Sequence, residues 1–175
     1  MNTRRAFLQN ASLLAGSLAI SSTPVLAAEK RANKLCFFTK HLQGLSFDDI
    51  ASLAVEMGVD GVESPIRPKG HIEPEKIEDE LPKYVEALKK QNLELTILTS
   101  GITEVSAEQR TEAVLRTAAK LGVKRFRMSY YKYDLQKPIW PQLQEIKPKL
   151  KDLIQLCQEI GIQPLFQNHS GKDYY

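Results

Sequence analysis

Met57-Gly58-Val59-Asp60-Gly61-Val62-Glu63, residues 57–63, joins the end of a predicted helix to the start of a predicted strand. A glycine directly after a helix adopts the left-handed conformation that other residues resist, so Gly58 is predicted to end a helix over 46–57. Val59 to Glu63 follows as a short run of strand length. The stretch therefore predicts one helix-to-strand unit.

The same pattern, a helix-ending glycine followed by a strand, recurs along the chain. Leu121-Gly122-Val123 and Ile160-Gly161-Ile162 repeat it, and Asn92 replaces the glycine before Leu93 because Asn also tolerates the left-handed region. Ser46 to Asp49 has the capping-box pattern of a helix start. Hydrophobic periodicity predicts strands over 35–39, 59–63, 93–99, 123–129 and 162–167. It predicts helices over 46–57, 75–91, 107–121 and 141–160, the second of them beginning or kinking at Pro82.

Strands that alternate with helices through short connections predict a parallel sheet, either a doubly wound open sheet or a closed barrel. A glycine-rich phosphate loop would favour the open sheet, but the first strand is followed by Thr39-Lys40-His41-Leu42-Gln43-Gly44. A barrel of eight units needs about 250 residues. We therefore expect an α/β fold of the (β/α) TIM-barrel type, incomplete, with about five parallel strands in sequential order.

The first 27 residues have the pattern of an export signal. Arg4 and Arg5 precede an apolar stretch over 11–20 that is too short to span a bilayer, and Val25 and Ala27 occupy the positions that a signal peptidase reads. Residues 3–8 also resemble the twin-arginine signal, with an ordinary secretory signal as the alternative. We expect a periplasmic protein whose barrel domain covers 28–175 after cleavage behind Ala27.

Charge and cysteine content restrict the partners. Removal of two of the 24 basic residues with the signal leaves a net charge of +1 against 21 acidic residues. A near-neutral chain lacks the electrostatic footprint expected for nucleic acid or an anionic membrane. Cys36 and Cys157 fall in a predicted strand and helix, so we expect both to be buried apolar residues, with a disulfide as the alternative.

In a (β/α) barrel the loops that follow the strands form the functional face. His41, His71 and His169 each follow a predicted strand, so we predict that they lie at the same end of the sheet. The connection over 64–74 holds Arg67 and His71 between prolines and a glycine. Such a stiff loop could bind sugar hydroxyls or an anion, or it could be an exposed basic connection.

Strand alternation predicts which charges face the barrel interior. If Phe126 faces the helices, its neighbours Arg125 and Arg127 point inward, where Glu63 is an available partner. Charges there are costly unless they are paired or bind a ligand. We therefore predict that Glu63 and Arg127 approach each other, either as an ion pair that holds the mouth or as a substrate-binding pair.

Four segments together resemble exported members of the xylose isomerase-like TIM barrel superfamily, the sugar phosphate isomerases/epimerases. They are Thr39-Lys40-His41-Leu42-Gln43, Asp60-Gly61-Val62-Glu63, Arg67-Pro68-Lys69-Gly70-His71 and Gln167-Asn168-His169-Ser170-Gly171. The resemblance implies an isomerase or epimerase acting on a sugar or sugar derivative. The residues expected to act are His169 and Glu63 in catalysis and Lys40, His41, Arg67 and His71 in substrate binding, with Arg127 added to the binding residues by the strand alternation.

The resemblance also implies a divalent metal, Mn²⁺, Mg²⁺ or Zn²⁺, bound by side chains from strands five to eight. Metal-bound substrate oxygens then acidify the neighbouring C–H group. Gln167 stands where many relatives have Glu; its amide oxygen can bind a metal but cannot act as a base. We expect the 175-residue chain to bind metal weakly or not at all, to show no isomerase turnover, and to aggregate or associate through open strand edges.

Two other function classes remain open. An endonuclease IV-like phosphodiesterase shares the barrel, but it predicts a basic groove and several metal-binding histidines that this sequence does not show. A non-catalytic sugar-binding module or an inactive fragment is the other alternative. The expected partner is a small sugar or sugar derivative, and export makes an unphosphorylated sugar or glycoside as plausible as a sugar phosphate.

Overall fold

The computed structural model describes residues 33–168, so the predicted export signal lies outside the described residues. Five strands form one sheet in the order β1-β2-β3-β4-β5, and each neighbouring pair is parallel. The strands are β1 (Cys36–Phe38), β2 (Gly61–Ile66), β3 (Glu94–Ser100), β4 (Arg125–Arg127) and β5 (Gln163–Leu165). The helical elements are η1 (Thr39–Leu42), α2 (Phe47–Glu56), η2 (Pro74–Lys76), α3 (Ile77–Lys90), α4 (Thr111–Lys120) and α5 (Ile139–Ile160). The predicted fold class and strand order are confirmed.

Local sequence signals set the ends of the helices. The Ser46 hydroxyl oxygen accepts the Asp49 backbone N–H at 3.2 Å, and the hydroxyl donates to the Asp49 carboxylate at 2.6 Å. Both contacts belong to the predicted cap at the start of α2. Gly58, Gly122 and Gly161 have φ of 67°, 93° and 72°, and Asn92 has φ 57°. The predicted left-handed positions after the helices are therefore confirmed.

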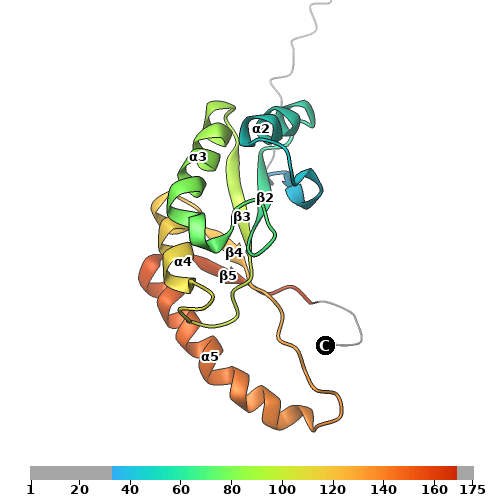
Figure 1. Cartoon of the computed structure of the whole chain (residues 1–175), viewed down its shortest axis with the longest axis vertical. Coiled ribbons are helices and arrows are strands. Elements are labelled where there is room, and N and C mark those ends of the chain that lie inside the picture. The colour runs from blue at the N-terminus through green and yellow to red at the C-terminus, as the bar shows by residue number, and fades with distance from the viewer. Residues whose placement is uncertain (1–32, 169–175) are drawn as a thin grey trace, which may run out of the picture. The chain divides into compact units, whose positions relative to one another are not determined.

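The two faces of the sheet differ in their covering. Helices α3, α4 and α5 lie along one side of the strands (Figure 1). Val62, Leu98 and Phe126 are fully buried, as expected for side chains under this helical layer. The neighbouring positions face the other way, because side chains alternate along a strand. That opposite face, the interior face of a barrel, has Phe38 in register with Glu63 and Thr99 in register with Arg127. Among residues 33–168 no helix is long and apolar enough to cross a membrane.

Two predicted boundaries differ from the structure by three residues or more. The second strand continues to Ile66 instead of ending at Glu63. The carbonyl oxygen of Pro65 accepts the His71 N–H at 2.8 Å, so the backbone polar groups of Pro65 face the returning loop and not β3. The N–H group that proline lacks therefore removes no hydrogen bond to β3. The helix predicted over 107–121 begins at Thr111, because Arg110 has φ 49° and leaves the helical region.

Two single-residue predictions also need correction. Helix α3 begins at Ile77 and runs through Pro82, which excludes a start at Pro82 and leaves the predicted alternative of a kink there; the carbonyl that Pro82 leaves without an intrahelical donor belongs to Glu78, which is exposed to water. Cys36 is exposed, whereas Cys157 is buried as predicted. Cys36 pairs with Gly61, which has no side chain to cover it.

Candidate functional site

The carboxyl ends of β2, β3 and β4 bring three polar side chains together on the interior face. Arg127 Nε lies 2.7 Å from Glu63 Oε1, and both side chains are mostly buried, with 17% and 18% exposed. The Thr99 hydroxyl donates to the same Glu63 oxygen, and Arg127 Nη2 donates to Thr99 Oγ1 at 3.2 Å. The predicted approach of Glu63 and Arg127 is confirmed.

Further groups surround the guanidinium of Arg127. Its Cζ lies 4.9 Å from the centre of the Phe38 ring, within the range of a cation–π contact. Its Nη1 donates to Gln167 Oε1, which also lies 3.5 Å from the Tyr130 hydroxyl. Arg127 is therefore held from β1, β2, β3 and the segment after β5.

A second polar cluster joins the loops that follow β1 and β2. His71 Nε2 lies 3.0 Å from the Thr39 carbonyl oxygen and 2.9 Å from Thr39 Oγ1. Thr39 Oγ1 lies 2.9 Å from Ser64 Oγ, which lies 2.7 Å from the Tyr84 hydroxyl of α3. Thr39, Ser64 and Tyr84 are fully buried, so these contacts tie the mouth of the sheet to the helical layer.

Burial sets the protonation of this second cluster. It lowers the pKa of the His71 imidazole below its ordinary value, and the hydrogen bond to the Thr39 backbone opposes part of that shift. Because the ordinary pKa of histidine is already below 7, His71 is neutral at neutral pH. Burial raises the pKa of the Tyr84 phenol, while the hydrogen bond to Ser64 and the nearby Thr39 hydroxyl act in the opposite direction.

The remaining predicted binding residues lie at the same carboxyl end but outside these clusters. Lys40 and His41 are exposed on η1, directly after β1, and Arg67 is half-buried in the loop after β2. Of the predicted histidines, His41 and His71 therefore lie at one end of the sheet. His169 lies outside the described residues.

The residues implied as metal ligands were tested against the geometry. Among residues 33–168, no group of three or more His, Cys, Asp or Glu side chains is arranged to hold a metal ion. The amide oxygen of Gln167 accepts from the guanidinium of Arg127. Because the positively charged guanidinium already contacts the Gln167 amide oxygen, this arrangement does not fit a metal ion bound at the same oxygen.

Sequence reasoning missed several members of the site. Thr99 and Phe38 were not singled out, although both are in register with a residue that was. Ser64 and Tyr84 were also missed. A usable signal was present for Ser64, because it is a polar residue between Val62 and Ile66 on the helix-facing side of a strand.

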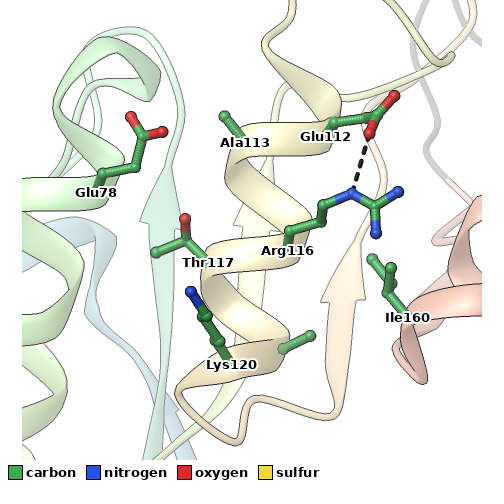
Figure 2. Close-up of a pocket in the computed structure, with 8 residues that line it drawn as sticks. Glu78, Glu112, Ala113, Arg116, Thr117, Lys120 and Ile160 are labelled. Carbon is green, nitrogen blue, oxygen red and sulfur yellow. Dashed lines mark hydrogen bonds and ion pairs between the residues drawn. The ribbon is translucent and has the colours of Figure 1, made fainter.

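A separate hollow of about 660 Å³ lies on the outer face of the sheet's helical layer. Figure 2 shows it over α4, between Glu78 of α3 and Ile160 of α5. The guanidinium in its lining is already paired, since Arg116 contacts Glu112 at 3.0 Å and Glu159 at 2.9 Å. Barrel chemistry occurs at the carboxyl ends of strands, so we assign the site to the interior mouth instead.

The loop that holds His71 depends on a glycine. A Cβ added to Gly70 would lie 2.4 Å from the Pro65 carbonyl oxygen and 2.8 Å from that of Arg67, both backbone atoms. Gly70→Ala is therefore expected to displace the loop and to cost about 1–3 kcal/mol of unfolding free energy, as overpacking does. Urea unfolding measures the cost, and loss of the His71 to Thr39 contact should appear in the His71 ring signals by NMR.

Gly101→Ala is the matched control for that loop. Its added Cβ would lie 3.6 Å from Pro68, an ordinary contact. We expect unfolding free energy equal to or slightly above that of the unmodified chain, because alanine restricts the unfolded chain. Equal effects of the two substitutions would contradict the role of the close approach at Gly70.

Comparison with known proteins shows the fold. No family model matches the sequence, and no curated protein matches it. A putative xylose isomerase from Rhodospirillum rubrum is 15% identical, with a TM-score of 0.62 over 81% of this chain and 56% of that chain. A D-psicose 3-epimerase solved in the presence of D-fructose is 15% identical, with a TM-score of 0.56 over 82% and 55%. The IOLI protein, solved with a zinc atom, is 18% identical, with a TM-score of 0.56 over 77% and 51%.

These likenesses agree with the arrangement of strands and helices. The chain has the fold of the xylose isomerase-like TIM barrels, with five parallel strands alternating with helices. It spans about half the length of the solved structures it matches. The fold places the clusters around Arg127 and His71 at the end of the sheet where such barrels carry their sites.

Proposed function

We propose that this chain provides the sugar-binding mouth of an isomerase or epimerase of the xylose isomerase-like kind, with Glu63 and Arg127 at its centre. One similar structure, a D-psicose 3-epimerase, was solved in the presence of D-fructose, and another is a putative xylose isomerase. Sugars present many hydroxyl groups, which both donate and accept hydrogen bonds. The mouth offers groups of both kinds.

The observation that carries the proposal is the asymmetric use of the Glu63 carboxylate. Both Arg127 Nε and the Thr99 hydroxyl contact Oε1, and no described residue donates a hydrogen bond to Oε2. A carboxylate oxygen that is held in place and left open can accept a sugar hydroxyl. The guanidinium of Arg127 has five N–H donors, so it can also reach a ligand while it holds Glu63.

The described residues supply binding groups more clearly than a catalytic base. Glu63 is engaged by a cation and a hydroxyl, and Gln167 is an amide. Proton transfer would therefore need a further group, for which His169 is the candidate that the sequence offers. Sugar binding is the part of the proposed function that the described residues can test directly.

Titration of the 175-residue chain with D-fructose, followed by NMR or calorimetry, tests the proposal. Arg127→Lys keeps the charge but loses the planar fork, so we expect at least about tenfold weaker binding from the loss of charge-assisted hydrogen bonds. Glu63→Gln should weaken binding in the same way. Arg116→Lys, on the outer face, is the matched control and should leave affinity unchanged. D-fructose binding that survives in Arg127→Lys and disappears in Arg116→Lys would move the site to the outer hollow.

A further inference from the structure

The hydroxyl chain beneath the mouth has a defined direction. Tyr84 is fully buried, and Ser64 Oγ, 2.7 Å away, is the one described atom within hydrogen-bonding distance of its phenol, since Thr39 lies farther from it. A buried O–H without an acceptor is costly, so the phenol donates to Ser64. Ser64 in turn donates to Thr39 Oγ1, and the Thr39 hydroxyl donates to the Glu63 backbone carbonyl at 3.2 Å. Each hydroxyl in the chain then donates once.

This direction determines the tautomer of His71. The Thr39 hydroxyl hydrogen is used on the Glu63 carbonyl, so Thr39 Oγ1 can only accept from His71 Nε2. The Thr39 carbonyl oxygen, 3.0 Å from the same nitrogen, is also an acceptor only. Nε2 must therefore carry the hydrogen, which leaves the lone pair of the neutral ring on Nδ1.

The second ring nitrogen is not fully buried. His71 Nδ1 has no hydrogen-bond partner among residues 33–168, and it is not among the buried side-chain atoms that lack one. It is thus accessible, and it offers a lone pair instead of a hydrogen. A lone pair attracts an O–H donor and repels the lone pairs of a phosphate or carboxylate oxygen.

We propose that His71 is a specificity-determining residue that accepts a hydrogen bond from an uncharged sugar hydroxyl through Nδ1 and disfavours an anionic group at that position. The inference rests on the proposed sugar-binding function and sharpens it, since the loop containing Arg67 and His71 had been open to either hydroxyls or an anion. Thr39 acts as a positioning residue, because its carbonyl and hydroxyl oxygens fix the ring. Tyr84 and Ser64 hold the Thr39 hydroxyl in the accepting orientation.

The tautomer can be tested without any ligand. Long-range ¹H–¹⁵N NMR of the unmodified chain at neutral pH distinguishes a protonated Nε2 from a protonated Nδ1. We expect the hydrogen on Nε2. A hydrogen on Nδ1 overturns the inference whatever the sugar does, and this readout does not depend on a variant that folds.

Two variants of His71 then separate its nitrogens. His71→Gln places an amide near the Nε2 position, where it can still donate to Thr39, but it removes the Nδ1 acceptor. His71→Asn keeps an acceptor oxygen near the Nδ1 position. For D-fructose we expect about tenfold weaker binding in His71→Gln, the loss of roughly one hydrogen bond, and a smaller loss in His71→Asn. Arg116→Lys again serves as the control with unchanged affinity.

The outcomes distinguish this inference from the proposed function. D-fructose binding that depends on Arg127 but is unchanged in His71→Gln overturns the inference and leaves the function standing. Failure of D-fructose to bind the unmodified chain overturns the proposed function, and the inference with it. Inorganic phosphate is the second probe. A lower affinity for phosphate in His71→Gln than in the unmodified chain would show that His71 binds an anion, which also overturns the inference.

Discussion

Arg127→Met is expected to lower the free energy of unfolding by about 2–3 kcal/mol and to abolish measurable D-fructose binding. Removing one partner of a buried ion pair costs about 3–5 kcal/mol because the other charge stays buried and unpaired. The value expected here is smaller, since the side chains of Arg127 and Glu63 remain 17% and 18% exposed. Methionine keeps much of the packing against Phe38 but loses the cation–π contact, the ion pair and the bond to Gln167. Urea unfolding, with sugar titration on the same sample, measures both effects.

The double variant Glu63→Gln/Arg127→Met measures the interaction between these two side chains apart from their contacts with other residues. With no carboxylate left uncompensated, it should regain part of the stability that Arg127→Met alone loses, giving a coupling energy of about 1–2 kcal/mol in a double-mutant cycle. Arg116→Met is the control, because Arg116 is paired on the exposed outer face and its loss should change stability little. A coupling energy near zero for Glu63 and Arg127 would show that the contact is solvent-screened and does not hold the mouth.

Phe126→Ala is expected to cost about 3–5 kcal/mol, the range for truncating a buried aromatic side chain. Phe126 is fully buried, stands opposite Leu98 of β3 in the sheet register and faces the helical layer. Its removal leaves a cavity between the sheet and the helices. For a domain whose total stability is about 5–15 kcal/mol, such a loss brings the chain close to unfolding at room temperature. The midpoint of urea denaturation by circular dichroism is the measurement.

Two further substitutions bracket that result. Phe126→Leu conserves most of the volume and should cost less than about 1.5 kcal/mol. Phe166→Ala removes the same ring from a position that is 56% exposed, so it should change stability by no more than about 0.5 kcal/mol. Similar losses for Phe126→Ala and Phe166→Ala would mean that Phe126 does not face a packed helical layer, and that the strand register is off by one residue.

Structural features that depend on a few neighbouring residues could be predicted from the sequence. The cap at Ser46, the left-handed turns at Gly58, Gly122 and Gly161, and the alternation of strands with helices all follow from local backbone preferences. Right-handed crossovers between short-connected units then led to five parallel strands in sequential order. Alternation within β4 also predicted that Arg127 would face away from the helices.

Contacts between segments that are distant in the sequence could not be predicted in the same way. The sequence proposed Glu63 as a partner for Arg127, but the strand register brought Thr99 and Phe38 to the same guanidinium. Register is a property of two strands together, so neither strand's own pattern shows which residue stands opposite.

The hydroxyl chain from Tyr84 to Thr39 likewise exists only because α3 packs over β2. Its direction follows from burial, which obliges each O–H to find an acceptor, and burial is created by the packing of whole layers. The same packing decides which nitrogen of His71 is open to a ligand. The sequence by itself therefore predicted the pairing of Glu63 with Arg127, whereas the other members of the mouth and the direction of its hydrogen bonds, on which the proposed selectivity depends, were decided by elements that pack together across 20 or more residues of chain.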